Sequence, residues 1–268
     1  MNWVRYRQEG QMCWGQLHHD GGEDYIQSYA GTPFDDGCRP VAGRGRLPVA
    51  STPLLAPCQP SKIVCIGRNY SAHARELGHE VLKEPLFFLK PPSSLLDPGG
   101  AIVLPRLSQQ VEYEGELAIV MRRRCAHFAG DADPRPYILG YTCLNDVTAR
   151  DLQKSDPQWT RAKGFDTFCP VGPWIAEAPQ AGERPWDGLE IETRVNGELR
   201  QHGNTRDFLF TLPQLLAAVT AVMTLEAGDV LATGTPAGVS KLAPGDQVRV
   251  TISGVGSLEN SVAATPLP

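Results

Sequence analysis

The chain has 268 residues, of which 41% are hydrophobic and 21% are charged, and its formal net charge is -5. This composition is typical of a soluble globular protein, and the acidic balance excludes the basic surface of a nucleic-acid-binding domain. No apolar run is long enough to span a membrane, and residues 1–7 lack the apolar core of a signal peptide. We therefore expect a cytoplasmic protein that binds neither nucleic acid nor membrane.

The contents of glycine, proline and cysteine indicate the fold class and the redox state of the thiols. The chain contains 27 Gly and 23 Pro, which predict many turns and favour a β-rich architecture. Its 7 Cys include no CxxC pair, and several lie in apolar segments. We expect them to be buried free thiols in a reducing cytosol.

The N-terminal region has the pattern of a small β-unit. Apolar and polar residues alternate through residues 1–30, and Glu9-Gly10 and Asp20-Gly21-Gly22 have the composition of hairpin turns. Residues 31–60 are rich in Pro, Gly and Arg and show little periodicity, which predicts a connector. We therefore predict an N-terminal β-unit with its connector over residues 1–57 and a main domain over residues 58–268.

Strands dominate the predicted main domain. Apolar segments predict strands at residues 63–66, 85–90, 102–104, 117–121, 137–145, 189–195, 229–233 and 247–252. Helices are predicted over 71–77, from 146 to 153, and over 212–223, while 164–172 is predicted to be a loop. Asn196-Gly197 is a strong hairpin signal. The fold class predicted from this pattern is β-rich α+β.

An acidic alternation precedes one of these strands. Glu112, Glu114 and Glu116 occupy every second position before an apolar segment, so a continuous strand would place their carboxylates on one face. Carboxylates this close repel one another, and a hard divalent cation such as Mg²⁺ or Mn²⁺ would relieve that repulsion. The alternative interpretation is a strand end that is exposed to water on one face.

His73 and Glu76 form a second candidate pair. They lie three residues apart in the predicted helix and would be neighbours on one helix face. A histidine oriented by a carboxylate is a common general base near neutral pH, and either residue could hold an attacking water. The alternative is an exposed pair on a polar helix.

Three further features can be interpreted as chemistry or as structure. Asp146 ends an apolar strand and could be a third oxygen ligand, or it could cap the helix that follows. Lys163 has apolar and aromatic neighbours and could stabilise an oxyanion or enolate, or its amine could reach solvent along its own stem. The Gly-rich turn 233–238 could grip a carboxylate with its amides and hydroxyls, although many turns share this composition.

Taken in order, these segments resemble the fumarylacetoacetate hydrolase family over about residues 60–260. The resemblance is carried by Gly67-Arg68-Asn69-Tyr70 with His73 and Glu76, Phe88-Leu89-Lys90-Pro91, Tyr113-Glu114-Gly115-Glu116-Leu117, Asn145-Asp146-Val147-Thr148-Ala149-Arg150-Asp151, Lys163-Gly164-Phe165-Asp166 and Thr233-Gly234-Thr235-Pro236. Six ordered motifs are far more specific than any one of them. The N-terminal β-unit also looks like the small N-terminal region common in that family.

The resemblance implies a fold and a set of site residues. The fold would be a mixed β-sandwich roll, and the main domain would be catalytic. Glu114, Glu116 and Asp146 would bind Mg²⁺ or Mn²⁺, with Glu112 outside the ligand set, either supporting the site or facing solvent. His73 and Glu76 match the water-activating dyad, Lys163 the cation over the reacting carbonyl, and Arg150 and Thr235 the residues that hold the substrate. A homodimer is also implied.

The resemblance further implies a 2-oxo acid or diacid substrate and three possible reactions. The reading we favour from the sequence is a metal-dependent hydrolase that cleaves a C–C bond in a β-diketo acid, such as an acylpyruvate or fumarylpyruvate, through a metal-stabilised enolate in aromatic catabolism. The alternatives are an enol/keto or double-bond isomerase of the 2-hydroxyhepta-2,4-diene-1,7-dioate or 5-carboxymethyl-2-hydroxymuconate type, and an oxaloacetate decarboxylase. A metal-dependent phosphohydrolase and a non-catalytic β-barrel binding module are rivals from other classes.

Overall fold

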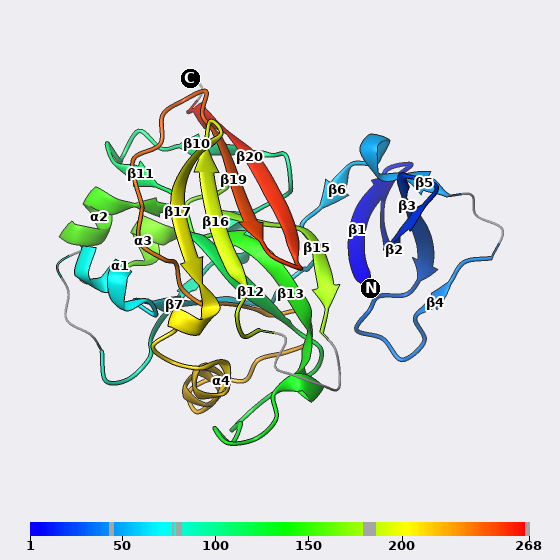
Figure 1. Cartoon of the computed structure of the whole chain (residues 1–268), viewed down its shortest axis with the longest axis horizontal. Coiled ribbons are helices and arrows are strands. Elements are labelled where there is room, and N and C mark those ends of the chain that lie inside the picture. Colours follow the sequence, from blue (N-terminus) through cyan, green and yellow to red (C-terminus); the bar gives the residue numbers. More distant parts are fainter. Residues whose placement is uncertain (43–45, 77, 79–81, 179–185, 266–268) are drawn as a thin grey trace.

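The computed structural model of the chain describes all residues except 43–45, 77, 79–81, 179–185 and 266–268 (Figure 1). In these described residues the strands form a 13-stranded sheet, a 5-stranded sheet and a 2-stranded ladder. Most neighbouring strands are antiparallel, but β7 (Ile63–Gly67) runs parallel to β18 (Val230–Ala232), so the large sheet is mixed. The predicted β-rich α+β class is therefore confirmed.

The elements have the following bounds. The remaining strands are β1 (Asn2–Gln8), β2 (Gln11–Asp20), β3 (Glu23–Ala30), β4 (Arg39–Pro40), β5 (Leu47–Pro48), β6 (Leu54–Leu55), β8 (Leu86–Lys90), β9 (Leu95–Leu96), β10 (Ala101–Leu104), β11 (Val111–Glu112), β12 (Gly115–Met121), β13 (Ile138–Asn145), β14 (Thr148–Ala149), β15 (Cys169–Glu177), β16 (Glu190–Val195), β17 (Glu198–Asn204), β19 (Gln247–Ile252) and β20 (Gly256–Ala264). The α-helices are α1 (Ser71–Glu76), α2 (Arg150–Ser155), α3 (Thr160–Lys163) and α4 (Leu212–Thr220).

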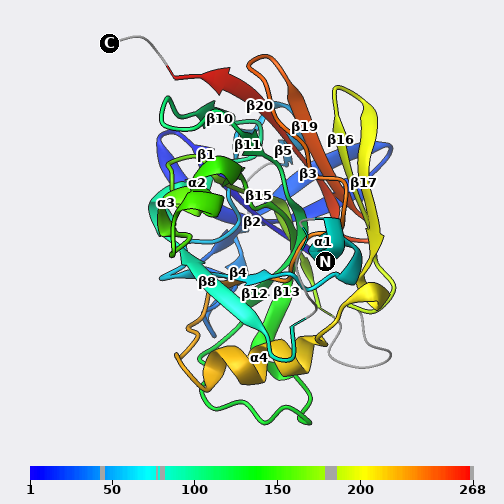
Figure 2. The ribbon, with the colours of Figure 1, turned by 90° about the vertical axis from the view of Figure 1, so that its left-hand side faces the viewer.

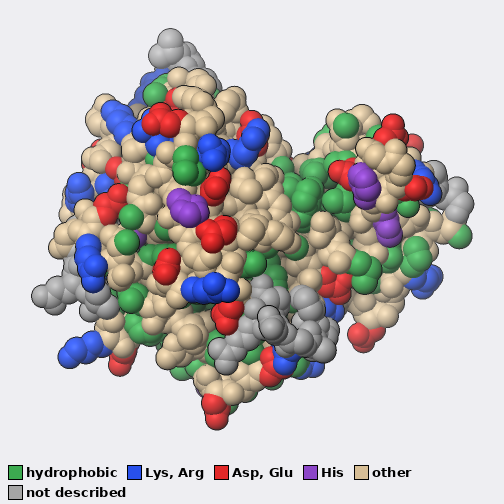
Figure 3. Space-filling view, viewed as in Figure 1, with side chains coloured by type: hydrophobic (Ala, Val, Ile, Leu, Met, Phe, Trp, Pro, Cys, Tyr) green, Lys and Arg blue, Asp and Glu red, His purple; other side chains and the backbone are tan. Residues whose placement is uncertain are grey.

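The N-terminal strands form the predicted hairpins and continue the large sheet. β1 pairs with β2 and β2 pairs with β3, both antiparallel. β1 also joins β15, with Asn2 opposite Ala176 and Trp3 opposite Ile175. The unit lies to the right of the main body in Figure 1, and hydrophobic side chains are visible in the hollow between the two parts in Figure 3.

The main body is layered around β12 and β13. The 5-stranded sheet β10-β20-β19-β16-β17 covers one side of these strands, and α4 lies beneath them (Figure 2). Leu117 and Ile119 of β12 contribute to the core shared with that sheet and α4, whereas Ala118 and Val120 contribute to a second core with β7. Burial of both faces explains why residues 117–121 of β12 are apolar without interruption rather than alternating.

Two boundaries differ from the sequence prediction. The helix predicted from Asp146 begins at Arg150, because Thr148 and Ala149 form β14 and pair with Glu112 and Val111 of β11. Asp146 is therefore not the N-cap of that helix, whose N-cap is Ala149.

The predicted loop 164–172 is also shorter than expected, because β15 begins at Cys169 and pairs with β9 and β13. The predicted end of α1 at 77 lies outside the described residues.

Candidate active site

Three buried carboxylates meet where β12 begins and β13 ends. Glu114 precedes β12, Glu116 lies on it, and Asp146 follows β13. The two strands are antiparallel, with Gly115 opposite Asn145, and Asp146 N donates to Glu114 O at 2.8 Å. Each carboxylate offers an oxygen, and these oxygens lie within 4.8 Å of one another. The structure thus brings together the three residues predicted to bind metal.

The alternation of glutamates does not reflect one continuous strand. β11 ends at Glu112 and β12 begins at Gly115, so the chain leaves strand geometry between them. Glu112 is buried and accepts from Arg150 Nε at 2.7 Å rather than joining the triad. It supports the site through Arg150, and neither a water-exposed strand end nor a solvent-facing Glu112 is correct.

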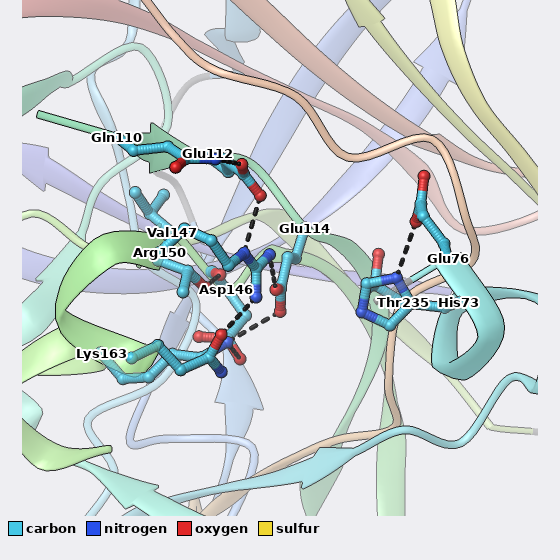
Figure 4. Close-up of polar contacts among 12 residues, drawn as sticks. His73, Glu76, Gln110, Glu112, Glu114, Asp146, Val147, Arg150, Lys163 and Thr235 are labelled. Carbon is cyan, nitrogen blue, oxygen red and sulfur yellow. Dashed lines mark hydrogen bonds and ion pairs between the residues drawn. The ribbon is translucent and has the colours of Figure 1, made fainter. Parts of the chain in front are cut away.

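Two lysines neutralise part of the triad from inside the protein. Lys163 Nζ lies 2.8 Å from Glu114 Oε2 and 2.7 Å from Asp146 Oδ2, and Lys90 Nζ lies 2.7 Å from Asp146 Oδ1. Figure 4 shows Lys163, Asp146 and Glu114 in this arrangement. Both ammonium groups are buried, so the alternative in which the Lys163 amine reaches solvent is wrong.

The pKa values of the buried site residues shift in different directions. Burial raises the pKa of Glu114, but Lys163 and Arg150 outweigh that effect and hold it below the ordinary value. Burial lowers the pKa of Lys163, but Asp146 and Glu114 raise it above its ordinary value, so the amine is cationic. Burial and the neighbouring carboxylates Asp146 and Glu114 raise the pKa of Glu116 well above its usual range.

Glu116 is the member of the triad without an ion pair among the described residues. Its Oε2 accepts from Gly234 N at 2.7 Å. A cation beside Glu116 would relieve the repulsion that raises its pKa, and an all-oxygen donor set suits a hard divalent ion. The residues present therefore fit Mg²⁺ or Mn²⁺.

Arg150 and Thr235 both face the site, but each is already engaged. Arg150 donates to Glu112 and Glu114, which lie on either side of its guanidinium. The Thr235 hydroxyl donates to Gly115 O at 2.9 Å and accepts from Gln201 Nε2 at 2.8 Å. Arg150 remains a charged part of the wall, while the Thr235 hydroxyl has its proton committed to the backbone.

His73 is buried, and Glu76 holds it from behind. His73 Nδ1 lies 3.1 Å from Glu76 Oε2, and Glu76 Oε1 accepts from Gly238 N at 2.9 Å. Burial raises the pKa of Glu76, but the hydrogen bonds from His73 and Gly238 lower it below its ordinary value. His73 is therefore buried although Glu76 is exposed, so the alternative of an exposed pair is wrong for His73 alone. Among the described residues, the second ring nitrogen of His73, Nε2, makes no hydrogen bond.

Backbone amides of the turn 233–238 do donate hydrogen bonds to carboxylates, but these carboxylates belong to the protein itself. Gly234 N donates to Glu116 and Gly238 N donates to Glu76. One turn thereby fixes the second carboxylate of the triad and the orienting partner of His73. A positive φ of 99° at Gly234 and of 107° at Gly238 explains why glycine is required at both positions.

These residues open on one cavity of about 270 Å³. Its wall includes the three carboxylates together with His73, Arg150 and Lys163. Thr235 also lines it, whereas Glu76 does not. All predicted site residues thus lie in or directly behind one pocket, as is typical of ligand sites.

Sequence reasoning missed three contributors to the site. Lys90 ends an apolar strand, and that position was a usable signal for a buried cation. Arg68, which lines the cavity, lies in one of the six motifs but was given no role. Gln201, whose Oε1 accepts from Gly115 N at 3.0 Å, carried no local signal. Contacts across 86 residues, as for Gln201, cannot be inferred from spacing.

A family model described as fumarylacetoacetate (FAA) hydrolase C-terminal matches residues 62–263, and one described as Rv2993c-like, N-terminal, matches residues 1–57. The chain belongs to the fumarylacetoacetate hydrolase family. The two matched regions meet near the boundary predicted at residue 57, although the division into two domains stays a prediction.

Members of the family that resemble this chain have different names. The mitochondrial oxaloacetate tautomerase of Arabidopsis thaliana is 43% identical over 208 residues, covering 76% of this chain and 92% of the relative. The solved structure of 5-carboxymethyl-2-hydroxymuconate delta-isomerase from Mycobacterium smegmatis has a TM-score of 0.89 at 40% identity, over 99% of this chain and 100% of that chain.

A fumarylacetoacetate hydrolase from Exiguobacterium antarcticum has a TM-score of 0.80 at 37% identity, over 99% and 100% of the two chains. The fumarylacetoacetate hydrolase fold and an enzymatic family are thereby established. No helix in the described ranges has the length and apolar character needed to cross a bilayer.

Proposed function

We propose that this chain is a tautomerase or isomerase of a 2-oxo dicarboxylic acid that moves a proton between C3 and the oxygen on C2. This corresponds to the isomerase alternative and not to the hydrolase favoured from the sequence. The names of the similar tautomerase and isomerase support it. The structural observation that supports it is His73, a buried histidine at the cavity wall whose Nδ1 lies 3.1 Å from a carboxylate oxygen of Glu76.

His73 supplies the base. In keto-to-enol tautomerisation a proton leaves C3, and a proton is added to the oxygen on C2. With Nδ1 tied to Glu76, the neutral imidazole accepts the C3 proton at Nε2 and then releases it to that oxygen. Glu76 does not line the cavity, so its role is to orient His73 and to stabilise its cationic form.

Lys163 and Arg150 supply positive charge where negative charge develops. When the C3 proton leaves, negative charge moves to the oxygen on C2. A fixed ammonium and a guanidinium in a buried wall stabilise that charge more than the neutral keto group. Glu114, Glu116 and Asp146 would hold Mg²⁺ or Mn²⁺, which when bound would fix the 2-oxo acid end and withdraw electron density from it. Thr235 would position this end mainly through the turn that carries it.

Hydrolysis of a β-diketo acid is a second candidate, supported by the hydrolase among the similar structures. In that reaction the same His73–Glu76 pair would activate a water. Decarboxylation of oxaloacetate would require neither removal of a C3 proton by His73 nor activation of a water. A homodimeric state also remains a proposal.

The deciding experiment is product analysis with oxaloacetate and an acylpyruvate in D₂O containing Mg²⁺ or Mn²⁺. Tautomerisation exchanges the C3 protons of oxaloacetate for deuterium and releases no pyruvate. Enzyme-dependent release of pyruvate from oxaloacetate would indicate decarboxylation, and its release from the acylpyruvate would indicate hydrolysis. Either release without accelerated exchange would overturn the proposal.

A further inference from the structure

Arg68 is a cation of the cavity wall that has no carboxylate partner among the described residues. Its side chain is half-buried, and its Nε is buried without a hydrogen-bond partner in the described part of the chain. Burial lowers the pKa of Arg68, and no acidic group of the described residues counteracts that effect. Arg150 differs, because Glu114 and Glu112 more than offset its burial. A buried donor without a partner costs free energy, which an anionic ligand would recover.

The backbone holds Arg68 in this position against its own preference. Its φ is 60°, in the left-handed region that residues other than glycine rarely adopt. The next residue, Asn69, is buried and fixes the turn, since its side chain donates to Thr233 O at 2.8 Å and accepts from Phe210 N at 2.9 Å. Backbone strain that is maintained by surrounding contacts is a feature of binding sites.

An aromatic wall connects Arg68 with the acidic end of the cavity. The Arg68 guanidinium lies 5.9 Å from the centre of the Trp159 ring, which packs edge-on at 5.2 Å against Phe88. The Lys163 ammonium lies 4.9 Å from the centre of the same Phe88 ring. Arg68 and Lys163 therefore place cations at the two ends of an apolar face in the cavity wall. This suits a short carbon chain that carries a negative charge at each end.

We propose that Arg68 binds the distal carboxylate of a dicarboxylic acid whose 2-oxo acid end lies at Glu114, Glu116 and Asp146. The assignment of that second end rests on the proposed function. A planar guanidinium held near an aromatic ring is well suited to two parallel hydrogen bonds to a carboxylate. Arg68 would thus make the enzyme prefer diacids to monoacids of the same chain length.

The test compares two unreactive ligands that differ only at the distal end. Malate carries a distal carboxylate, and 2-hydroxybutanoate carries a methyl group in its place. Binding of each is measured by calorimetry in Mg²⁺. We expect wild-type protein to bind malate at least about tenfold more tightly, on the scale of one charge-assisted hydrogen-bonded pair. Arg68→Met should reduce the ratio to near one and leave the affinity for oxalate, which has no distal group, unchanged.

Three further variants keep the test decisive. Arg68→Lys should retain part of the preference, because a lysine keeps the charge but loses the planar fork. Arg75→Met is the matched control, because Arg75 is an exposed arginine on α1 that does not line the cavity. Lys154 lines the cavity with an exposed side chain. Loss of the preference in Lys154→Met, with its retention in Arg68→Met, would overturn the assignment to Arg68.

Failure of this proposal can be separated from failure of the proposed function. If wild-type protein exchanges the C3 protons of oxaloacetate but Arg68→Met keeps the full preference for malate, the role of Arg68 is wrong and the function stands. If the preference depends on Arg68 but no exchange occurs, the diacid site stands and the function is wrong. As a kinetic check, Arg68→Met should raise KM for oxaloacetate much more than KM for its 4-ethyl ester.

Discussion

The ammonium of Lys163 lies 2.7 Å from the carboxylate of Asp146, with both groups buried between α3 and the end of β13. Lys163 is thus one of three cations, with Lys90 and Arg150, that the protein pairs with this acidic cluster. Removing one partner of a buried pair leaves the other uncompensated, which is costly. Lys163 is consequently part of both the stability and the chemistry of the site.

We predict that Lys163→Met lowers kcat by about 10²-fold or more, on the scale of losing one oxyanion-stabilising donor. Binding of oxalate, which mimics the planar enolate, should also weaken. Steady-state kinetics and oxalate inhibition measure both. Arg161→Met is the control on the same helix, because Arg161 is exposed and pairs with Asp156. A raised KM with unchanged kcat and oxalate affinity would show that Lys163 only anchors the substrate.

The metal site is tested through Glu116. Because Glu116 has no ion pair among the described residues and a strongly raised pKa, a divalent cation would stabilise the folded protein through it. Mg²⁺ with oxalate should therefore raise the Tm of wild-type protein, and Glu116→Ala should abolish both this rise and the activity. Glu190→Ala, at an exposed glutamate of β16, is the control. Full activity of Glu116→Ala in EDTA would rule out the site.

The dyad makes a different prediction. Glu76→Gln should reduce turnover by about 10²–10⁴-fold, the usual contribution of a general base, because His73 loses its anionic partner. The rise in Tm with Mg²⁺ and oxalate should persist, since Glu76 lies outside the triad. A variant that lost metal affinity but kept its rate at saturating metal would contradict this assignment.

Local spacing was sufficient for those parts of the site that are close in sequence. The alternation indicated Glu114 and Glu116 together with Glu112, and the three-residue separation indicated His73 and Glu76. Asp146 was predicted to join the glutamates because it lies at the end of a strand. In the structure, the pairing of β12 with β13 brings Asp146 close to Glu114 and Glu116. The strand order that makes them neighbours is a long-range property.

The remaining parts of the site depend on contacts that spacing does not encode. Glu112 shares the alternation of its neighbours, but the break before β12 and the ion pair with Arg150, 38 residues away, give it a different partner. The predicted helix start at Asp146 was wrong for a related reason, because pairing with β11 keeps Thr148 in an extended conformation. In each case tertiary pairing outweighed the local pattern.

The Thr235 hydroxyl is predicted to be mainly structural. Thr235→Val leaves Gly115 O and Gln201 Nε2 without one partner each in a buried region, so the free energy of unfolding should fall by about 1–3 kcal/mol. Urea unfolding measures this loss, and Thr235→Ser, which keeps the hydroxyl, should restore most of it. An unchanged stability with a raised KM would show instead that the hydroxyl serves the substrate directly.

The cysteines give a prediction about pH. All 7 thiols are free, and five of them, including Cys143 and Cys169, are buried. Burial raises the pKa of both Cys143 and Cys169 to about 12. A thiol reagent at pH 8 should accordingly label Cys13 and Cys38 in native protein and the others only after unfolding, because the thiolate is the reactive form. Rapid labelling of Cys143 in native protein would contradict this burial.

The same shift links stability to alkaline pH. In the unfolded chain a thiol ionises near pH 8.5, whereas Cys169 in the folded protein keeps its proton up to a pH of about 12. The stabilisation is therefore fully present below about pH 8.5 and is lost as pH rises through the interval between these values. Cys169→Ala removes one such group and should flatten the fall by up to about 1.4 kcal/mol per pH unit. Urea unfolding at several pH values between 8 and 10 measures the two slopes. Identical slopes for wild type and variant would show that Cys169 ionises alike in both states.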